Sequence, residues 1–310
     1  MLSLAAPGAS ATIRGMHREP AATAAAEPTS RYAQVNGLRL HYFDWGGDAL
    51  RIFVLCHGGS AHAHWWDYVA PQLTPYGRVI ALDLRGHGRS EWAEIYGPGS
   101  YISDLKAFIR DSIRKPVVLI GHSMGGEVAQ RVTADCPELI EALVAVDAPH
   151  GGPPLRTRLM WRWKRRKQHL GRPEFQSIEE LVRRFRLSPP GDNLSREQLA
   201  ELAVKGAEQL PNGKWAFRFD PKTRKMAPGW KRHLRFPLKR IAVPTLILRG
   251  AQSTLLSARR ARCLRRKIKG SVLKEIPRAH HHVPLDNPDD TAAAILDFMR
   301  SLRSGKQTGQ

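Results

Sequence analysis

Short apolar runs alternate along the chain with stretches whose apolar residues recur at helical spacing. Residues 52–56, 78–82, 117–120 and 142–146 form continuous apolar runs of strand length, which is typical of strands buried on both faces. A hairpin is predicted before them, because residues 32–35 and 38–42 flank Asn36-Gly37, a pair suited to a type I′ turn. Further strands are predicted at 244–249 and 272–276, and helices at 64–73, 101–113, 127–134, 259–269 and 291–302.

This alternation of strand and helix predicts an α/β fold with a mostly parallel sheet of about eight strands. One long interruption, residues 150–237, has helical periodicity at 178–185 and 194–210, and predicts a helical cap inserted over the sheet. The core then comprises residues 31–149 and 238–303. Residues 1–30, rich in Ala and Pro and without a secretory h-region, are expected to be a disordered leader, and 304–310 a tail.

The charge balance is strongly basic, and most of the excess lies in the interruption. The chain has 49 Lys and Arg against 28 Asp and Glu, a formal charge of +21, and residues 151–240 contain 23 basic and 8 acidic side chains. Charge alone attracts any polyanion, and no zinc finger or helix-turn-helix accompanies it, so nucleic-acid binding is not favoured as the main function. A basic cap next to a pocket would favour anionic substrates. A solvated surface is the ordinary alternative.

Other features exclude several classes of protein. No run of 18 apolar residues is present, so no transmembrane span is predicted. The three cysteines, Cys56, Cys136 and Cys263, are far apart and without a C-x-x-C motif, which favours free structural thiols and a reducing, cytoplasmic location over disulfides or zinc.

The candidate chemistry begins at Gly121-His-Ser-Met-Gly125, which lies between a predicted strand and a predicted helix. This is the context of a nucleophile elbow, in which Ser123 sits in a strained turn and flanking glycines avoid collision with neighbouring elements. The Met124 N–H, at the start of the helix, and the Gly59 N–H, in the His57-Gly-Gly59 loop after an earlier strand, are the predicted oxyanion-hole donors. His57 itself is expected to pack and bond loops.

Together these stretches resemble the α/β-hydrolase superfamily, in its capped, esterase-like form with a serine nucleophile. The similar segments are His57–Gly59, Asp83–Ser90, Gly121–Gly126, Pro244–Gly250 and His281–Pro288, and the resemblance covers about residues 31–303. It implies a catalytic histidine five residues before an acid that precedes x-Pro, which selects His281 over its neighbours His280 and His282. The three consecutive histidines could also form a metal site, but this alternative is not favoured because no spaced carboxylates or cysteines accompany them.

The triad acid is where the sequence departs from the commonest pattern of this superfamily. The usual Asp follows the strand at 244–249, but residues 250–257 contain no carboxylate, and Ser253 and Thr254 stand in its place. A branch of the superfamily carries the acid after the sixth strand, and the resemblance then assigns it to Asp147. The alternative is that the acid has been lost, leaving a weak hydrolase or a ligand-binding pseudoenzyme.

The resulting expectation is hydrolysis of a carboxylic ester or related acyl bond in a small-molecule substrate, through an acyl-enzyme and with no cofactor or metal. Ser123, Asp147 and His281 are the predicted triad, and Trp65 and His122 the expected substrate contacts. Hydrolysis of a C–C or amide bond, a binding-only protein, and a polyanion-binding protein with a vestigial pocket stay open. A serine at the elbow argues against epoxide hydrolases and haloalkane dehalogenases, which the resemblance associates with an Asp nucleophile.

Overall fold

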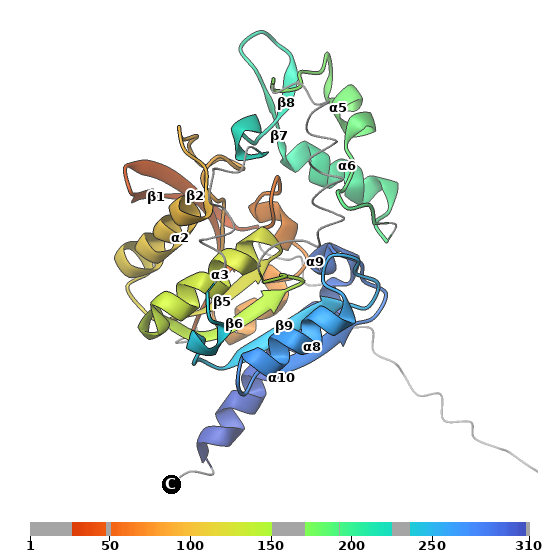
Figure 1. Cartoon of the computed structure of the whole chain (residues 1–310). Coiled ribbons are helices and arrows are strands. Elements are labelled where there is room, and N and C mark those ends of the chain that lie inside the picture. Colours follow the sequence, from red (N-terminus) through yellow and green to blue (C-terminus); the bar gives the residue numbers. More distant parts are fainter. Residues whose placement is uncertain (1–26, 48–50, 151–170, 192, 225–235, 308–310) are drawn as a thin grey trace, which may run out of the picture.

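The computed structural model describes residues 27–47, 51–150, 171–191, 193–224 and 236–307. One sheet of eight strands runs through it in the order β1-β2-β4-β3-β5-β6-β9-β10. β2 is antiparallel to β1 and β4, and every other neighbouring pair is parallel. The predicted α/β class with a mostly parallel sheet is confirmed (Figure 1).

The central strands match the apolar runs closely because these runs are buried on both faces of the sheet, whereas the edge strands β1 and β10 are partly exposed. The elements are β1 (Thr29–Val35), β2 (Leu38–Gly46), β3 (Ile52–Cys56), β4 (Arg78–Leu82), β5 (Val117–His122), β6 (Ile140–Val146), β9 (Thr245–Gly250) and β10 (Val272–Ile276). Asn36 and Gly37 both have positive φ, as the predicted type I′ hairpin requires.

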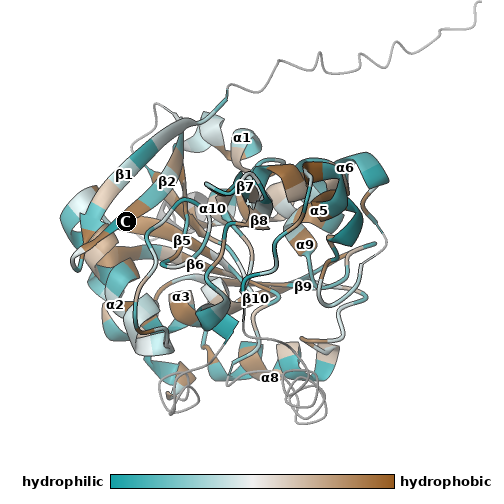
Figure 2. Cartoon of the chain, turned by 90° about the horizontal axis from the view of Figure 1, so that it is seen from above, coloured by the Kyte–Doolittle hydropathy of each residue, from teal (hydrophilic) through white to brown (hydrophobic). Residues whose placement is uncertain are grey.

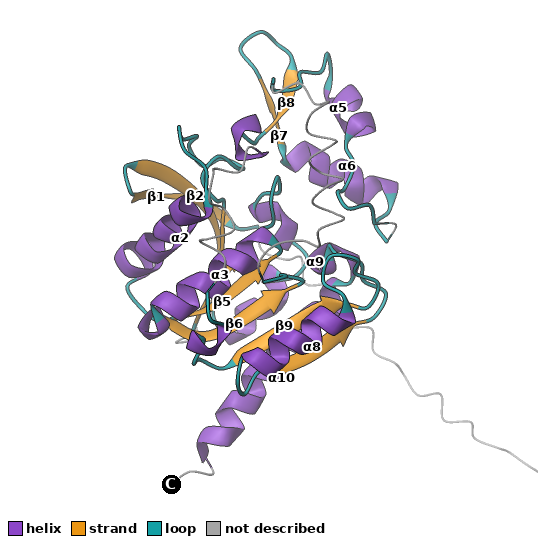
Figure 3. Ribbon diagram, viewed as in Figure 1, coloured by secondary structure: helices purple, strands orange, loops and turns teal. Residues whose placement is uncertain are grey.

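Helices cover both faces of the sheet (Figure 3). One face packs against α2 (Pro98–Ala107), the π-helical turn Phe108–Ile113, α3 (Met124–Asp135) and α8 (Ala258–Lys267). The other packs against α1 (Ala70–Leu73) and α10 (Pro288–Gln307). Figure 2 shows the hydrophobic strands β5 and β6 between these layers.

One predicted helix, 64–73, is broken in the structure. Its place is taken by a 3-10 turn at Ala63–Trp66 and the short α1. Pro71 explains the break, because it has no N–H to donate and its ring opposes the carbonyl four residues earlier. The closing helix α10, by contrast, runs to Gln307, beyond the predicted end at 302.

We use the name cap for the described part of the insertion between β6 and β9. This part contains α5 (Ile178–Arg184), α6 (Arg196–Lys205), β7 (Ala207–Gln209) and β8 (Trp215–Phe217), together with a short 3-10 turn. Helix was predicted as far as residue 210, but Gly206 caps α6 and the chain then turns back as a hairpin through Gly213. The cap aromatics form its own small core, with Leu181 and Ala203 at the centre and Phe175, Phe185, Trp215 and Phe217 around them. Trp161, Trp163 and the basic run 156–167 lie outside the described residues, as do residues 1–26 of the predicted leader.

Several contacts join the cap to the core, and Figure 1 shows the cap above the carboxyl ends of the strands. The Asp220 N–H donates to the Gly86 carbonyl at 2.8 Å, and its carboxylate accepts from the Tyr96 hydroxyl at 2.8 Å. Lys205 pairs with Asp67 at 2.8 Å. His282 bonds the Pro189 carbonyl at 2.9 Å, which brings the cap against the loop that carries His281.

The helix α3 approaches the end of β3 closely, and this approach requires glycine at position 125. A Cβ on Gly125 would lie 2.5 Å from the His57 carbonyl oxygen and 2.7 Å from that of Cys56. Both are backbone atoms, so the helix would have to move away from the sheet. Gly171 is the matched contrast, since a Cβ there would meet nothing within 4 Å.

We therefore expect Gly125→Ala to lower the free energy of unfolding by about 2 kcal/mol or more, as for other overpacked core positions. Gly171→Ala is expected to change it by less than about 0.5 kcal/mol, the usual range for surface substitutions. Urea unfolding of the two variants and the wild type measures the difference. Equal stability of Gly125→Ala and wild type would contradict the close approach.

Candidate active site

Ser123 occupies the turn between β5 and α3. Its backbone has φ 53° and ψ −118°, a conformation that L-residues rarely adopt, and its N–H is held by the Val146 carbonyl at 3.0 Å. Gly121 permits the turn, because a Cβ there would lie 2.5 Å from the Gly125 carbonyl oxygen. The strained turn leaves the Ser123 side chain half-buried at the start of the helix, above the strand ends.

A chain of hydrogen bonds joins Ser123, His281 and Asp147. The His281 Nε2 lies 2.9 Å from the Ser123 Oγ, and its Nδ1 lies 2.6 Å from the Asp147 Oδ2. A carboxylate only accepts, so Nδ1 carries the proton and Nε2 is left as the acceptor for the serine hydroxyl. The imidazole is thereby oriented to remove a proton from Ser123.

The three side chains come from distant parts of the sequence, and parallel strands bring them to one edge. Ser123 follows β5, Asp147 follows its neighbour β6, and His281 lies in the loop after β10. The carboxyl ends of parallel strands share one edge of the sheet, where open α/β folds bind ligands. The loop bearing His281 is fixed by a hydrogen bond from the His122 Nε2 to the His281 carbonyl at 2.8 Å.

Asp147 is completely buried, with 0% of its surface exposed, and its carboxylate has three donors. His281 and the Ser253 hydroxyl both contact Oδ2 at 2.6 Å, and the Gly250 N–H donates to Oδ1 at 3.2 Å. Such donors are what a buried charge requires. The loop after β9, which lacks a carboxylate, thus contributes two donors to the carboxylate on β6.

The two predicted oxyanion-hole positions lie next to each other beside Ser123. A Cβ on Gly59 would be 3.7 Å from the Met124 sulfur, and one on Gly58 would be 3.3 Å from the Ser123 Cβ. Met124 is the first residue of α3, so its N–H has no partner within the helix. In the part of the chain that the structure describes, no hydrogen bond uses the N–H of Gly59 or Met124. Binding of an oxyanion by these two N–H groups stays a prediction.

Trp65 and His122, the expected substrate contacts, form a stacked pair whose ring centroids are 6.1 Å apart. Trp65 is 7% exposed and packs between core and cap, together with Leu187 and Leu202. His122 is buried behind Gly58. The neighbouring Trp66 is wholly buried in the core. Substrate contact by Trp65 and His122 stays a prediction.

The loop residues around the triad have structural roles. His57 bonds the Gly58 carbonyl and accepts from the Leu84 N–H, as the expectation of a packing role requires. Asp83 accepts hydrogen bonds from the Ala63 N–H at 2.6 Å, the Arg89 N–H at 3.0 Å and His41 at 2.7 Å. Burial would raise the pKa of Asp83, but the bond from His41 and the nearby histidines hold it below its usual value. Asp83 thereby anchors the segment that carries Trp65.

No metal cluster and no membrane-spanning helix is found among the described residues. The His281 ring contacts Ser123, whereas the His282 ring bonds the Pro189 carbonyl of the cap. No group of three or more His, Cys, Asp or Glu in the described ranges could hold a metal ion. No helix there is long and apolar enough to cross a bilayer. The three cysteines are free, and burial raises the pKa of Cys56 to about 12, which makes it a poor nucleophile.

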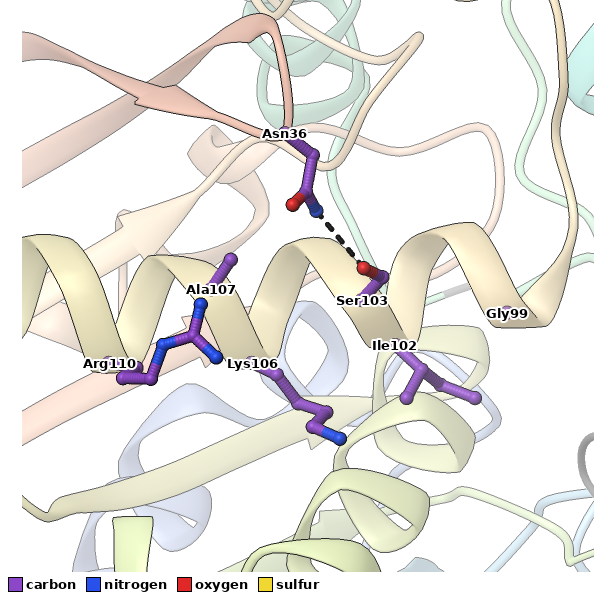
Figure 4. A pocket seen from close by; sticks show the side chains of 7 residues that line it. All are labelled: Asn36, Gly99, Ile102, Ser103, Lys106, Ala107 and Arg110. Atoms are coloured by element: carbon purple, nitrogen blue, oxygen red, sulfur yellow. Dashed lines mark hydrogen bonds between the residues drawn. The ribbon is translucent and has the colours of Figure 1, made fainter.

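A surface depression of about 280 Å³ lies elsewhere, along α2 and the β1–β2 turn. Figure 4 shows its lining side chains: Asn36, Gly99, Ile102, Ser103, Lys106, Ala107 and Arg110. None of the triad residues contributes to it. The depression is shaped mainly by one side of a helix and contains no nucleophile paired with a base.

Comparisons with known proteins identify the family of the chain. A family model described as the alpha/beta hydrolase family matches residues 53–294. The chain belongs to the alpha/beta hydrolase family. It is an enzyme of that family, whose similar members carry names of esterases and epoxide hydrolases.

Three relatives show the range within the family. Esterase Rv0045c of Mycobacterium tuberculosis is 30% identical over 57% of this chain, and the match spans only 58% of that protein. Epoxide hydrolase 4 of Mus musculus is 26% identical over 86% of this chain and 77% of its own. The crystal structure of E-2-(acetamidomethylene)succinate hydrolase superposes with a TM-score of 0.75 over 88% of this chain and 99% of its own, at 23% identity. This last likeness concerns the fold.

The residue that the sequence did not assign is Ser253. The sequence offered one indication of its role, which is its position: Ser253 stands where the commonest pattern of the superfamily has the triad acid. The contact with Asp147 depends on β6 and β9 being neighbours in the sheet.

Several histidines near the site are buried and neutral, which makes the stability of the fold depend on pH. Burial lowers the pKa of His57 to about 3 and of His62 to about 4, and neighbouring histidines add to the effect. Burial and the adjacent His281 lower the pKa of His282 to about 3, and those of His87 and His122 are lowered too. In the unfolded chain each of these groups would have a pKa of about 6.5.

Below that pH the unfolded state binds protons that the native state does not, so the free energy of unfolding must fall with pH. Each such histidine removes up to about 1.4 kcal/mol per pH unit below pH 6.5. We expect the melting temperature to be nearly constant from pH 8 to 7 and to drop steeply between pH 6.5 and 5. Differential scanning calorimetry across this range measures it. A constant melting temperature down to pH 5 would refute the assignment of neutral buried histidines.

Proposed function

We propose that the chain is a serine hydrolase that cleaves a carboxylic ester or related acyl bond through an acyl-enzyme. The observation that carries the proposal is the continuous hydrogen-bonded chain from the Ser123 Oγ through His281 to the buried Asp147. A nucleophile, a base and an orienting acid within bonding distance are the general signature of covalent catalysis. The Ser-Asp-His order along the chain is also that of the α/β-hydrolase fold.

The chemistry follows from the positions of the atoms. Ser123 Oγ attacks the substrate carbonyl while its proton passes to His281 Nε2, and Asp147 stabilises the imidazolium that forms. The oxygen that becomes negative binds the N–H groups of Gly59 and Met124. His281 then returns the proton to the leaving group, whose bond to the carbonyl carbon breaks. A water molecule, deprotonated by His281, then attacks the acyl carbon. The bond from that carbon to the Ser123 Oγ breaks, the carboxylic acid product leaves, and Oγ takes the proton back from His281. No cofactor enters these steps.

Ser123 also separates this chain from the epoxide hydrolases among its relatives. Epoxide opening in this fold is associated with an Asp nucleophile, whereas a serine alkoxide suits acyl transfer. A C–C or amide bond is the alternative target for the same triad. Asp147, placed at 2.6 Å from His281, supports turnover over a binding-only protein.

We expect Ser123→Ala to lower kcat/KM for short p-nitrophenyl esters by about 10⁴-fold or more, and Asp147→Asn by about 10³- to 10⁴-fold. The first removes the nucleophile, and the second removes the negative charge that holds the Nδ1 proton of His281. Initial rates of wild type and variants, assayed together, measure both effects.

The matched control is Asp104→Asn, which alters another buried aspartate, 1% exposed and paired with Arg85 outside the site. It is expected to lose stability and keep kcat. Near-full activity of Asp147→Asn would show that Asp147 is not the acid. Should wild type be inert to every ester, a fluorophosphonate tests Ser123 directly: Oγ displaces fluoride and forms an Oγ–P bond, visible by mass spectrometry. Absence of labelling at Ser123 would refute the proposal.

A further inference from the structure

Ser253 lies in the loop after β9, where it is buried and contacts the carboxylate of Asp147. Its side chain is 6% exposed, and its Oγ is 2.6 Å from the Asp147 Oδ2. No Asp or Glu occurs between residues 250 and 257, so Ser253 is the polar side chain that this loop directs at the triad.

The direction of the Ser253 proton is settled by its other partners. The backbone N–H groups of Leu255 and Leu256 donate to the same Oγ, at 3.3 and 3.2 Å. A hydroxyl has two lone pairs and one proton. Because both lone pairs are engaged, the proton is directed to Asp147, which as a carboxylate can only accept. The loop backbone therefore holds Ser253 as a donor.

The two carboxylate oxygens of Asp147 accept different numbers of hydrogen bonds. Oδ2 accepts from both Ser253 and His281 at 2.6 Å, while Oδ1 accepts from the Gly250 N–H at the longer distance of 3.2 Å. A hydrogen bond to a charged carboxylate is stronger than one between neutral groups and draws negative charge toward the donor. Ser253 thus shares the charge of the very oxygen that stabilises the His281 imidazolium.

We propose that Ser253 is a positioning residue of the triad, which holds the Asp147 Oδ2 toward His281 and shares the negative charge of that oxygen. This inference rests on the proposed function for the roles of Asp147 and His281. Ser253 contacts neither Ser123 nor the oxyanion donors through any hydrogen bond of the described residues, and acts only through Asp147.

The test is the pH dependence of kcat/KM for a p-nitrophenyl ester in Ser253→Ala. Without the hydroxyl, more negative charge on Oδ2 favours the protonated imidazole, so the midpoint of the acidic limb should rise by roughly 0.5–1 pH unit. kcat should fall by about 3- to 30-fold, because Asp147 loses one hydrogen-bond donor and with it half or more of the stabilisation that this bond gives. KM should not change. Ser253→Thr, which keeps the hydroxyl, should restore the midpoint, and Ser253→Cys, a weak donor, replaces the alanine variant if that does not fold.

Ser90→Ala is the matched control, because Ser90 is also a buried hydroxyl, bonded to the Asp83 carbonyl at 2.6 Å and the His41 N–H at 2.8 Å. It should lose comparable stability with no shift of the midpoint. A second readout needs no substrate: the low-field ¹H NMR resonance of the His281 Nδ1–H, followed against pH, should show the same upward shift in Ser253→Ala.

The outcomes separate the two proposals. An unshifted midpoint in Ser253→Ala, with Ser123→Ala inactive, overturns the role of Ser253 and leaves the triad standing. An equal shift in Ser90→Ala also overturns it, because the effect would then follow from general loosening. If Ser123→Ala keeps wild-type activity, the proposed function fails instead, and the NMR midpoint still decides whether Ser253 acts on His281.

Discussion

The site depends on one buried carboxylate being held in place where three parallel strands end. Asp147 is out of contact with water, and its charge is tolerated because His281, Ser253 and the Gly250 N–H surround it with donors. That same arrangement fixes the tautomer of His281 and points its free nitrogen at Ser123. The order β5-β6-β9-β10 in the sheet is what brings these loops together.

Packing around the carboxyl ends of the strands holds the residues of the site in position. Glycine at 121 and 125 lets α3 approach the strands closely enough to hold Ser123 in its strained turn. Asp83 ties the loop after β4 to the segment bearing Trp65, and His122 and His282 attach the His281 loop to the core and to the cap. Both rings are buried, and burial lowers the pKa of each.

The position of the carboxylate departs from the commonest pattern of the superfamily. Where related sequences carry the acid after β9, this chain has a serine, and the carboxylate comes from the neighbouring strand β6. The two positions face one another because β6 and β9 are parallel and in register at their ends: Val146 is paired with Leu248. The Ser253 hydroxyl, in the loop after β9, and the Asp147 carboxylate, directly after β6, fill the volume between the two strand ends.

The sequence predicted the strands, the mostly parallel sheet and Ser123, because long apolar runs and the glycine-flanked serine act locally, and its resemblance to the superfamily selected His281. It left Asp147 in competition with a lost acid, since spacing along the chain does not show which strands become neighbours. Only the tertiary structure placed Asp147 against His281 and gave Ser253 a partner. It also formed the β7–β8 hairpin after Gly206. These outcomes depend on pairing and packing between residues distant in sequence, which local propensity does not encode.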